Sequence, residues 1–196
     1  MRSEIDYFKI EANHVAPEQG NILIAEPFLA DNYFKRSIVY LVGHGVEGSV
    51  GFILNKPVSM KIVDLIPDFP SNDFSLSLGG PVSPNTIHYI HTLGDIIPDS
   101  VRVKDDIYWS GDFDVVKQLI AAKQINKSQI RFFIGYSGWS PGQLENEIDQ
   151  NSWLIHHSNN NFIMKNDKEH AWSKILYDMG GKYIMWANSP ENPSMN

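Results

Sequence analysis

The segment Gly135-Tyr-Ser-Gly-Trp139 places a serine between two glycines, directly after the apolar run 130–134. This order resembles the Gly-x-Ser-x-Gly elbow, in which a sharp strand-to-helix turn exposes a nucleophilic serine. The elbow needs a glycine at its fifth position for close helix–strand packing, and this chain has Trp139 there. Such a serine also needs a histidine base and an acid. Residues of these types follow downstream: His156, His157, His170, Asp149, Asp167 and Asp178.

Seven histidines make a serine, acid and histidine set easy to assemble by chance. We therefore interpret the segment as a structural turn and predict no catalytic residues. A serine hydrolase that uses Ser137 stays as an alternative. The helix that follows could bind an anion at its N-terminus. However, Ser140 and Gln143 form a capping-box pattern, and Glu145 adds negative charge to the early turns, so we expect a self-capped helix.

Polar residues at the ends of apolar strands are the main candidates for ligand contacts. Arg36, Asn55 and Lys56 flank such strands, and the Gly79-Gly80 turn could form a backbone nest for an anion. A tight turn or a solvent-facing strand end is the simpler interpretation of each. With Trp139 and Glu145 of the glycine segment, they complete the predicted ligand-binding set: Arg36, Asn55, Lys56, Gly79, Gly80, Trp139 and Glu145.

Metal and cofactor motifs give no support for a bound group. His88 and His91 would point to opposite faces of a strand, as would His156 and His157, and no His-Glu-x-x-His pattern occurs. The chain has no P-loop and no Gly-x-Gly-x-x-Gly. We predict no metal and no cofactor.

Composition narrows the class of protein. A chain of 196 residues with 42% hydrophobic content can bury a full core. The absence of cysteine excludes disulfides and thiol chemistry. A formal net charge of −7, with no basic stripe of lysine and arginine, disfavours direct nucleic-acid binding. No apolar run approaches a membrane span, so we predict a soluble cytoplasmic protein without membrane contact.

The elements that must position these residues follow from periodicity and turn signals. We predict strands over 21–30, 37–43, 49–55, 76–82, 86–92, 106–109, 130–134, 153–156 and 161–164. The second and third of these read as an antiparallel hairpin. We predict a short helix or turn over 60–65, and helices from Asp112 to about 123, from Pro141 to about 149, and over 172–179, ended by Gly180-Gly181.

Five segments in the same order resemble the AlgH/YqgE family, also called UPF0301 or DUF179. They are Gly20–Pro27 with Asp31, Phe34–Leu41, Gly51–Pro57, Gly79–Val82, and Gly135–Glu145 with Asn151–Trp153. The resemblance spans about residues 20–186 and implies a bacterial protein with one compact domain of the mixed α/β (α+β) class, whose largely antiparallel sheet is flanked by helices. The family has no established activity, and its usual small residue at position 137, often alanine, implies no shared hydrolysis by Ser137.

The function we predict is therefore a non-catalytic cytoplasmic binding protein with a regulatory role, whose partner is an unknown protein or small molecule. A DNA-binding transcriptional regulator, which the AlgH name suggests, is a further alternative, although no helix-turn-helix pattern occurs. We expect residues 1–196 to form a single domain, with an N-terminal extension over 1–19 and a poorly ordered tail over 187–196.

Overall fold

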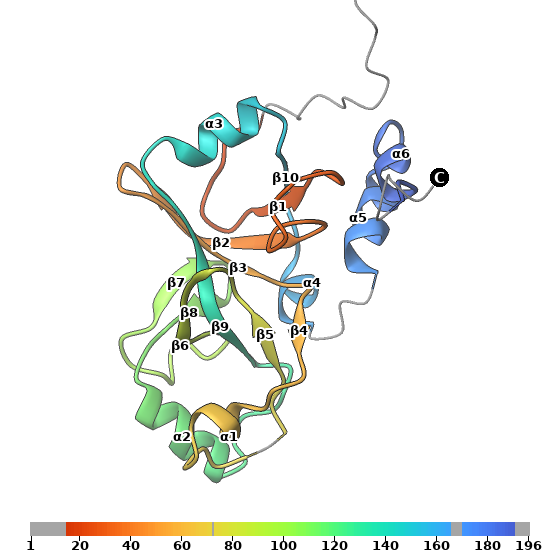
Figure 1. Ribbon diagram of the computed structural model, residues 1–196. Coiled ribbons are helices and arrows are strands. Elements are labelled where there is room, and N and C mark those ends of the chain that lie inside the picture. Colours follow the sequence, from red (N-terminus) through yellow and green to blue (C-terminus); the bar gives the residue numbers. More distant parts are fainter. Residues whose placement is uncertain (1–14, 72, 166–169, 191–196) are drawn as a thin grey trace, which may run out of the picture.

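A computed structural model describes residues 15–71, 73–165 and 170–190, and this part of the chain contains ten strands and six helices (Figure 1). The strands are β1 (Ile22–Ala25), β2 (Ile38–Gly45), β3 (Gly48–Ile53), β4 (Pro57–Val58), β5 (Leu76–Leu78), β6 (Val82–His91), β7 (Val101–Lys104), β8 (Ile107–Trp109), β9 (Ile130–Trp139) and β10 (Trp153–His156). The helices are α1 (Ile62–Leu65), α2 (Phe113–Ala121), α3 (Gln143–Asp149), α4 (Asn160–Met164), α5 (Ala171–Met179) and α6 (Tyr183–Ala187).

Strand β9 organises the sheet because it pairs with three other strands. Its C-terminal half pairs with β3 and its N-terminal half with β6, both antiparallel, while β5 adds the parallel pairing. The main path of the sheet runs β10-β1-β2-β3-β9-β6-β8-β7. Helices α1 and α2 lie beyond one end of the sheet and α3 beyond the other, with α5 and α6 beside β10 and β1 (Figure 1). The predicted single domain with a mixed, largely antiparallel sheet is confirmed.

The sheet curls until β7 approaches the start of β1. The side-chain amide of Gln19 donates hydrogen bonds to the carbonyl oxygens of Arg102 and Val103, each at 3.0 Å. A Cβ atom added to Gly20 would lie 2.5 Å from the Lys104 side chain, so the segment before β1 passes directly over β7. These long-range hydrogen bonds tie the segment before β1 to β7 without strand pairing between them.

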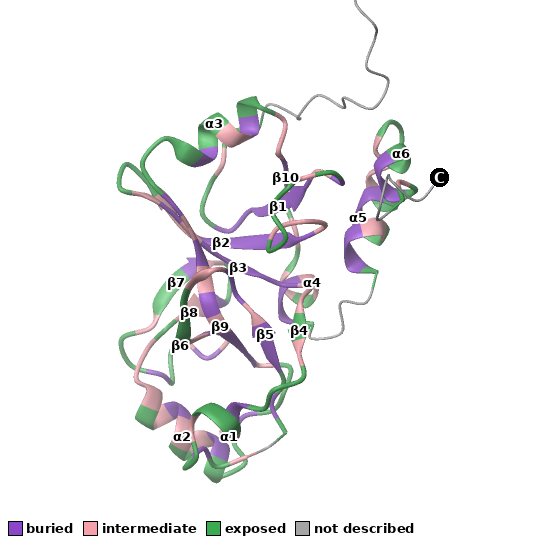
Figure 2. Cartoon of the chain, viewed as in Figure 1, coloured by how far each residue is buried: buried purple, intermediate pink, exposed green. Residues whose placement is uncertain are grey.

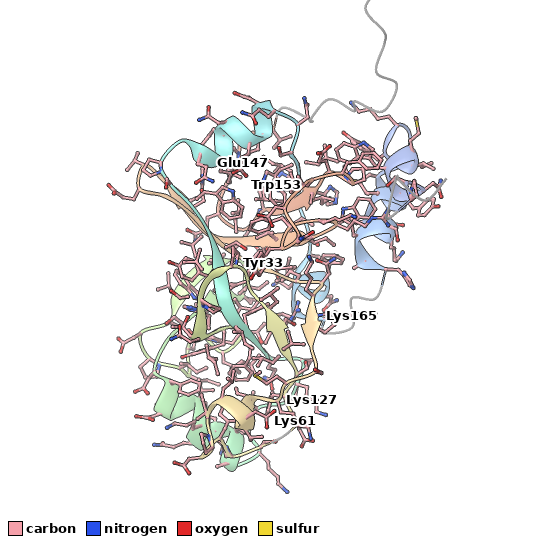
Figure 3. All side chains as sticks on the ribbon, in the orientation of Figure 1. Tyr33, Lys61, Lys127, Glu147, Trp153 and Lys165 are labelled. Carbon is pink, nitrogen blue, oxygen red and sulfur yellow. The ribbon has the colours of Figure 1, made fainter. Side chains whose placement is uncertain are left out.

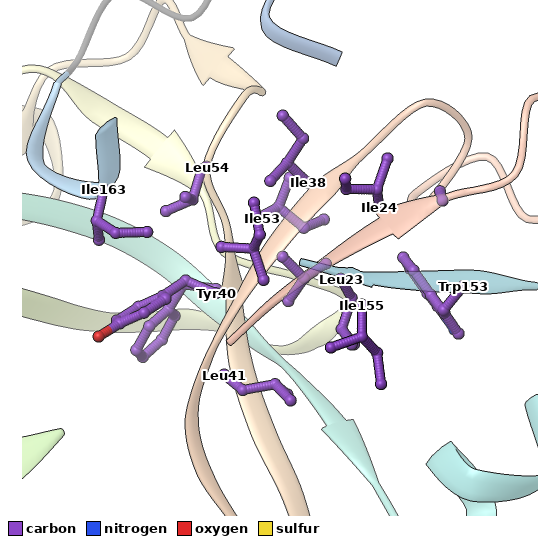
Figure 4. Close-up of a cluster of buried hydrophobic side chains, with 14 of the residues drawn as sticks. Leu23, Ile24, Ile38, Tyr40, Leu41, Ile53, Leu54, Trp153, Ile155 and Ile163 are labelled. Carbon is purple, nitrogen blue, oxygen red and sulfur yellow. The ribbon is translucent and has the colours of Figure 1, made fainter. Parts of the chain in front are cut away.

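Two apolar clusters fill the fold. The larger one joins β1, β2, β3 and β10 to α3, α4 and α5, and Figure 4 shows ten of its side chains by name, from Leu23 to Ile163. The smaller one lies where α1 and α2 cover the other end of the sheet, around Phe69, Val116 and Phe132. Strands β1, β2 and β10 are buried along most of their length, whereas the tip of the β2–β3 hairpin is exposed (Figure 2).

Several local predictions are confirmed. The hairpin forms with the register Val39 to Ile53 and His44 to Ser49. The Asp112 side chain caps α2 by accepting the backbone N–H groups of Asp114 and Val115. Helix α5 ends at Gly180, whose positive φ of 69° suits a glycine C-cap. None of the described helices has the length and apolar character needed to cross a membrane.

Other local predictions are wrong, each for a physical reason. The strand expected to end at residue 134 continues to Trp139, because Gly135 takes a positive φ of 63° within the strand instead of turning it. The strand expected over 161–164 is α4, which begins at the Asn159 side chain as its N-cap. Helix α3 begins at Gln143 after an N-cap at Gly142, not at Pro141. Strand β7 and helix α6 were not predicted.

The predicted N-terminal extension falls mainly on residues 1–14, and the predicted tail mainly on residues 191–196, which lie outside the described residues. Within the described part, Ala187 is buried at the end of α6.

Candidate functional site

A cleft of about 730 Å³ lies beside the β2–β3 hairpin, where β9 leaves the sheet toward α3. Its size is that of a small-molecule site. The lining residues come from the hairpin, from the start of β6 and from the end of β9: Gly43, His44, Gly45, Val46, Glu47, Gly48, Ser49, Val50, Val82, Tyr136, Gly138, Trp139, Ser140 and Pro141.

The register of β2, β3 and β9 sorts these residues onto two faces of the sheet. Gly43 pairs with Val50, and Val50 pairs with Gly138, so the three share one face. His44, Ser49 and Trp139 form the next row and share the opposite face. Burial alternates accordingly along the end of β9, where residues 136 and 138 are half-buried and residues 137 and 139 are buried. The open cleft therefore lies over the glycine row.

The floor of the cleft is backbone with few side chains. A Cβ atom added at Gly43 or Gly45 would meet nothing within 4 Å, so the space above both residues is open. At Gly138 an added Cβ would lie 3.1 Å from the Tyr136 ring. The Tyr136 ring and the side chains of Val50 and Val82 are the apolar groups on this face of the sheet. Glycine in a strand commonly marks a place where another group approaches the backbone closely.

On the opposite face, polar side chains join the hairpin to α3. The Ser49 hydroxyl lies 2.8 Å from Nδ1 of His44, and Nε2 of His44 lies 3.8 Å from a Glu145 carboxylate oxygen. Ser49 is buried, and Glu145 is about half exposed. A serine, a histidine and an acid thus meet here, but the serine hydroxyl is directed away from the glycine floor. This arrangement ties the hairpin to α3.

Glu147 of α3 binds two tryptophans at once. One of its carboxylate oxygens accepts the indole N–H of Trp139 at 2.9 Å and that of Trp153 at 2.8 Å. The other oxygen accepts the Gln143 side-chain amide at 2.9 Å. Phe34 stacks on Trp139, with 5.9 Å between ring centroids, and meets Trp153 edge-on. Figure 3 labels Glu147, on α3, and Trp153 close to it. This cluster fixes the wall behind the cleft.

Ser137 has a structural role. It lies inside β9, fully buried, and its hydroxyl donates a hydrogen bond to the carbonyl oxygen of Gly79 at 2.9 Å. The strand runs on through the predicted turn, so the nucleophile elbow does not form. The prediction of a turn here is corrected, and the geometry argues against a hydrolase that uses Ser137.

Two of the predicted ligand contacts, Arg36 just before β2 and Asn55 just after β3, hold the backbone together. The Asn55 side chain accepts the N–H of Ile38 and donates to the carbonyl oxygen of Arg36, each at 2.8 Å. The Arg36 guanidinium donates to the Ser189 carbonyl oxygen and lies over the Trp172 ring at 4.9 Å. These bonds link β2 to the end of β3 and to the chain after α6.

The other three predicted groups lie in different places. The Lys56 ammonium donates to the Asn32 carbonyl oxygen at 2.9 Å, and burial lowers its pKa although nearby Asp31 opposes that shift. Gly79 and Gly80 pack against β9, where an added Cβ at Gly80 would lie 2.3 Å from the Tyr136 backbone. Of the predicted set, the structure brings only Trp139 to the cleft, with Glu145 beside it through His44.

Sequence reasoning missed the residues that form the cleft itself, above all Gly43, Gly45, Glu47 and Tyr136. In the sequence, the glycines look like those of an ordinary hairpin connection, because Gly48 and the hairpin tip separate the two strands. Their spacing carried a signal, because glycines at alternate positions of one strand clear one face of a sheet. Within the described residues, no group of three His, Asp or Glu side chains could hold a metal ion.

Comparison with known proteins gives a consistent result. The AlgH-like family model (DUF179) matches residues 22–184. UPF0301 proteins from Bacteroides fragilis and Parabacteroides distasonis are 43% and 42% identical, each alignment covering 100% of both chains. A UPF0301 protein from Chlorobaculum parvum is 41% identical over 90% of this chain and 95% of its own.

Two solved structures share the fold. The solution structure of the AlgH protein from Pseudomonas aeruginosa superposes with a TM-score of 0.71 at 24% identity, covering 90% of this chain and 97% of that one. The crystal structure of a Corynebacterium diphtheriae protein superposes with a TM-score of 0.75 at 17% identity, covering 96% of this chain and 100% of that one.

Proposed function

We propose a non-catalytic binding function for this chain, which belongs to the AlgH-like (DUF179) family of UPF0301 proteins. The ligand is a small molecule held in the cleft beside the β2–β3 hairpin. Binding without turnover acts by shifting the populations of protein states, so the output of such a protein is regulatory.

The open glycine floor is the observation that supports this proposal. Gly43 and Gly45 leave empty space where other residues would place side chains, although neither has a backbone conformation that requires glycine. A ligand can thus lie directly on the strand backbone. Ser49 and Ser140 line the cleft, but the Ser49 hydroxyl bonds to His44 on the face opposite the glycine floor. Ser137 lies outside the lining, where it is buried and bonds to Gly79. The cleft therefore offers a contact surface more than a reactive group.

The test is a substitution that places a side chain from the floor into the cleft. Leucine at position 43 meets no atom near its Cβ, so Gly43→Leu should fold with nearly unchanged stability while its side chain occupies the ligand's space. Asn85→Leu is the matched control, because Asn85 is exposed on β6 and lines a different depression. Amide chemical shifts would be recorded while a fragment library of aromatic and aliphatic probes is added.

We expect aromatic probes to shift the amides of Gly43, Gly45 and Gly138 in the unaltered protein and in the control. Gly43→Leu should abolish those shifts. The proposal fails if probes at millimolar concentration leave these amides unmoved, or if Gly43→Leu binds them as well as the unaltered protein does. Thermal unfolding of both variants separates loss of binding from loss of fold.

A further inference from the structure

We infer that the ligand of this cleft carries a planar cation, such as an amidinium or guanidinium group. This inference rests on the proposed binding function and names the chemical class of its ligand. Three observations support it: the charge at the cleft, the position of an aromatic ring, and the shape of the floor.

Glu47 supplies the charge. It is exposed at the tip of the hairpin and is the only aspartate, glutamate, lysine or arginine among the described residues that line the cleft. No ion pair or hydrogen bond to its carboxylate occurs within the described part of the chain. The whole chain carries a formal net charge of −7, which also favours a cationic ligand. A carboxylate accepts two N–H groups from an amidinium or guanidinium in one plane.

Tyr136 supplies an aromatic ring in the same cleft. The ring is half-buried, meets His88 edge-on at 5.6 Å between centroids, and lies against the floor at Gly138. Burial lowers the pKa of His88, which therefore stays neutral at pH 7 and adds no opposing charge. The electron-rich face of a tyrosine attracts a cation within about 6 Å of the ring centre.

The floor favours a flat group. The backbone of residues 43, 45 and 138 presents peptide planes without side chains above two of them, so a planar group can lie against the strand at van der Waals distance. A spherical ammonium would leave part of this surface uncovered. The flat floor, the carboxylate at its rim and the tyrosine ring together fit a planar cation.

The experiment compares three probes of one shape and different charge: benzamidine, benzamide and benzoate. Dissociation constants would be measured by amide chemical-shift titration at pH 7.5 and low salt, where charge effects are least screened. We expect benzamidine to bind about tenfold more tightly than benzamide, from the ion pair and the cation–π contact together. Benzoate should bind most weakly.

Variants of single residues test which side chains cause the preference for benzamidine over benzamide. Glu47→Gln should remove most of the difference between benzamidine and benzamide. Tyr136→Leu should weaken benzamidine more than benzamide. Glu145→Gln is the matched control, since it removes a carboxylate of the same type near the cleft that pairs with His44 instead of lining the site.

The outcomes distinguish the two proposals. If all three probes bind at the glycine floor with equal affinity, or if Glu47→Gln keeps the preference, the planar-cation inference is overturned and the binding function stands. If no probe of any charge shifts the floor amides, both are overturned. Equal loss of preference in Glu47→Gln and Glu145→Gln would show a general field effect and would also contradict the assignment to Glu47.

Discussion

His91 shows how one buried side chain makes stability depend on pH. Its Nδ1 accepts the N–H of Leu93 at 3.1 Å, while Nε2 lies 2.9 Å from the Ser110 carbonyl oxygen. This pattern requires the neutral tautomer with the proton on Nε2, because a protonated Nδ1 could not accept. Burial lowers the pKa of His91, with the bond to Ser110 opposing that shift.

A folded-state pKa below the unfolded value of 6.5 means that the unfolded chain binds a proton first as pH falls. The contribution of His91 to stability is then complete above about pH 7 and decreases as pH falls through 6.5 toward the folded pKa. We expect His91→Phe to lose about 2 kcal/mol at pH 7.5, since the buried N–H of Leu93 and the partly buried carbonyl oxygen of Ser110 lose their partner. The variant should lose less further stability than the unaltered protein between pH 7.5 and 5. Urea unfolding at both pH values measures this, and an unchanged pH dependence would contradict it.

Arg131 is a buried cation that has no ion pair with a carboxylate among the described residues. It is 1% exposed, donates to the carbonyl oxygens of Ile163 at 2.6 Å and Leu54 at 2.9 Å, and lies over the Phe133 ring. Burial lowers its pKa to about 9. The planar guanidinium bridges α4 and the residue that follows β3 in a way that a single ammonium cannot.

We therefore expect Arg131→Lys to be destabilised by about 3 kcal/mol, because it keeps a buried charge with fewer bonds. Arg131→Met should be less destabilised than Arg131→Lys, since it buries no charge. Unfolding in guanidinium chloride of the unaltered protein and the two variants gives the order of their stabilities directly. A lysine variant more stable than the methionine variant would contradict this account.

At the scale of elements, α3 packs on the sheet through the buried side chains of Leu144 and Ile148 and is also bonded to it through Glu147. Replacing it with alanine leaves the indole N–H groups of Trp139 and Trp153 without an acceptor, which should cost about 2 to 4 kcal/mol. Glu145→Ala on the same helix should change stability by less than about 1 kcal/mol, because its contact with His44 is long and half exposed. Urea unfolding followed by tryptophan fluorescence compares the two, and similar losses in both would argue against the bond to the indoles.

The elements also show where local patterns predict structure and where they fail. Asp112 and the apolar spacing after it predicted α2, since a cap and a helix face involve only nearby residues. Gly135 predicted a turn, yet it lies within a continuous strand, where only its positive φ departs from regular strand geometry. The two cases look alike in sequence, because a glycine with positive φ serves both. What distinguishes them is pairing with β3 and β6, which are distant in sequence.

The candidate site was predicted only in part for the same reason. Trp139 was identified from its own segment. The floor residues Gly43 and Val50 come from strands nearly 100 residues earlier in the chain. Asn55 and Arg36 looked like ligand contacts because polar residues at strand ends have that appearance, but the Asn55 side chain bonds to the backbone beside β2 and the Arg36 side chain bonds to Ser189. Only the register shows which residues share the open face.

At the scale of the whole molecule, the curled sheet depends on contacts across its seam. We expect Gln19→Ala to cost about 1 kcal/mol, because the carbonyl oxygens of Arg102 and Val103 lose their donor. Amide hydrogen exchange should become faster in β7 and β8 while β10, at the other end of the path, keeps its protection. Uniformly faster exchange throughout the sheet would contradict a local role for this seam.

The position of β9 in the chain has a consequence for biosynthesis. This strand, over Ile130–Trp139, pairs with β3, β5 and β6, which are all synthesised earlier. The interval between the synthesis of β1 and that of its partner β10 is longer still. At about 5–20 residues per second, the nascent chain holds unpaired apolar strands for many seconds before their partners emerge. The sheet can therefore be completed only after most of the chain has been translated.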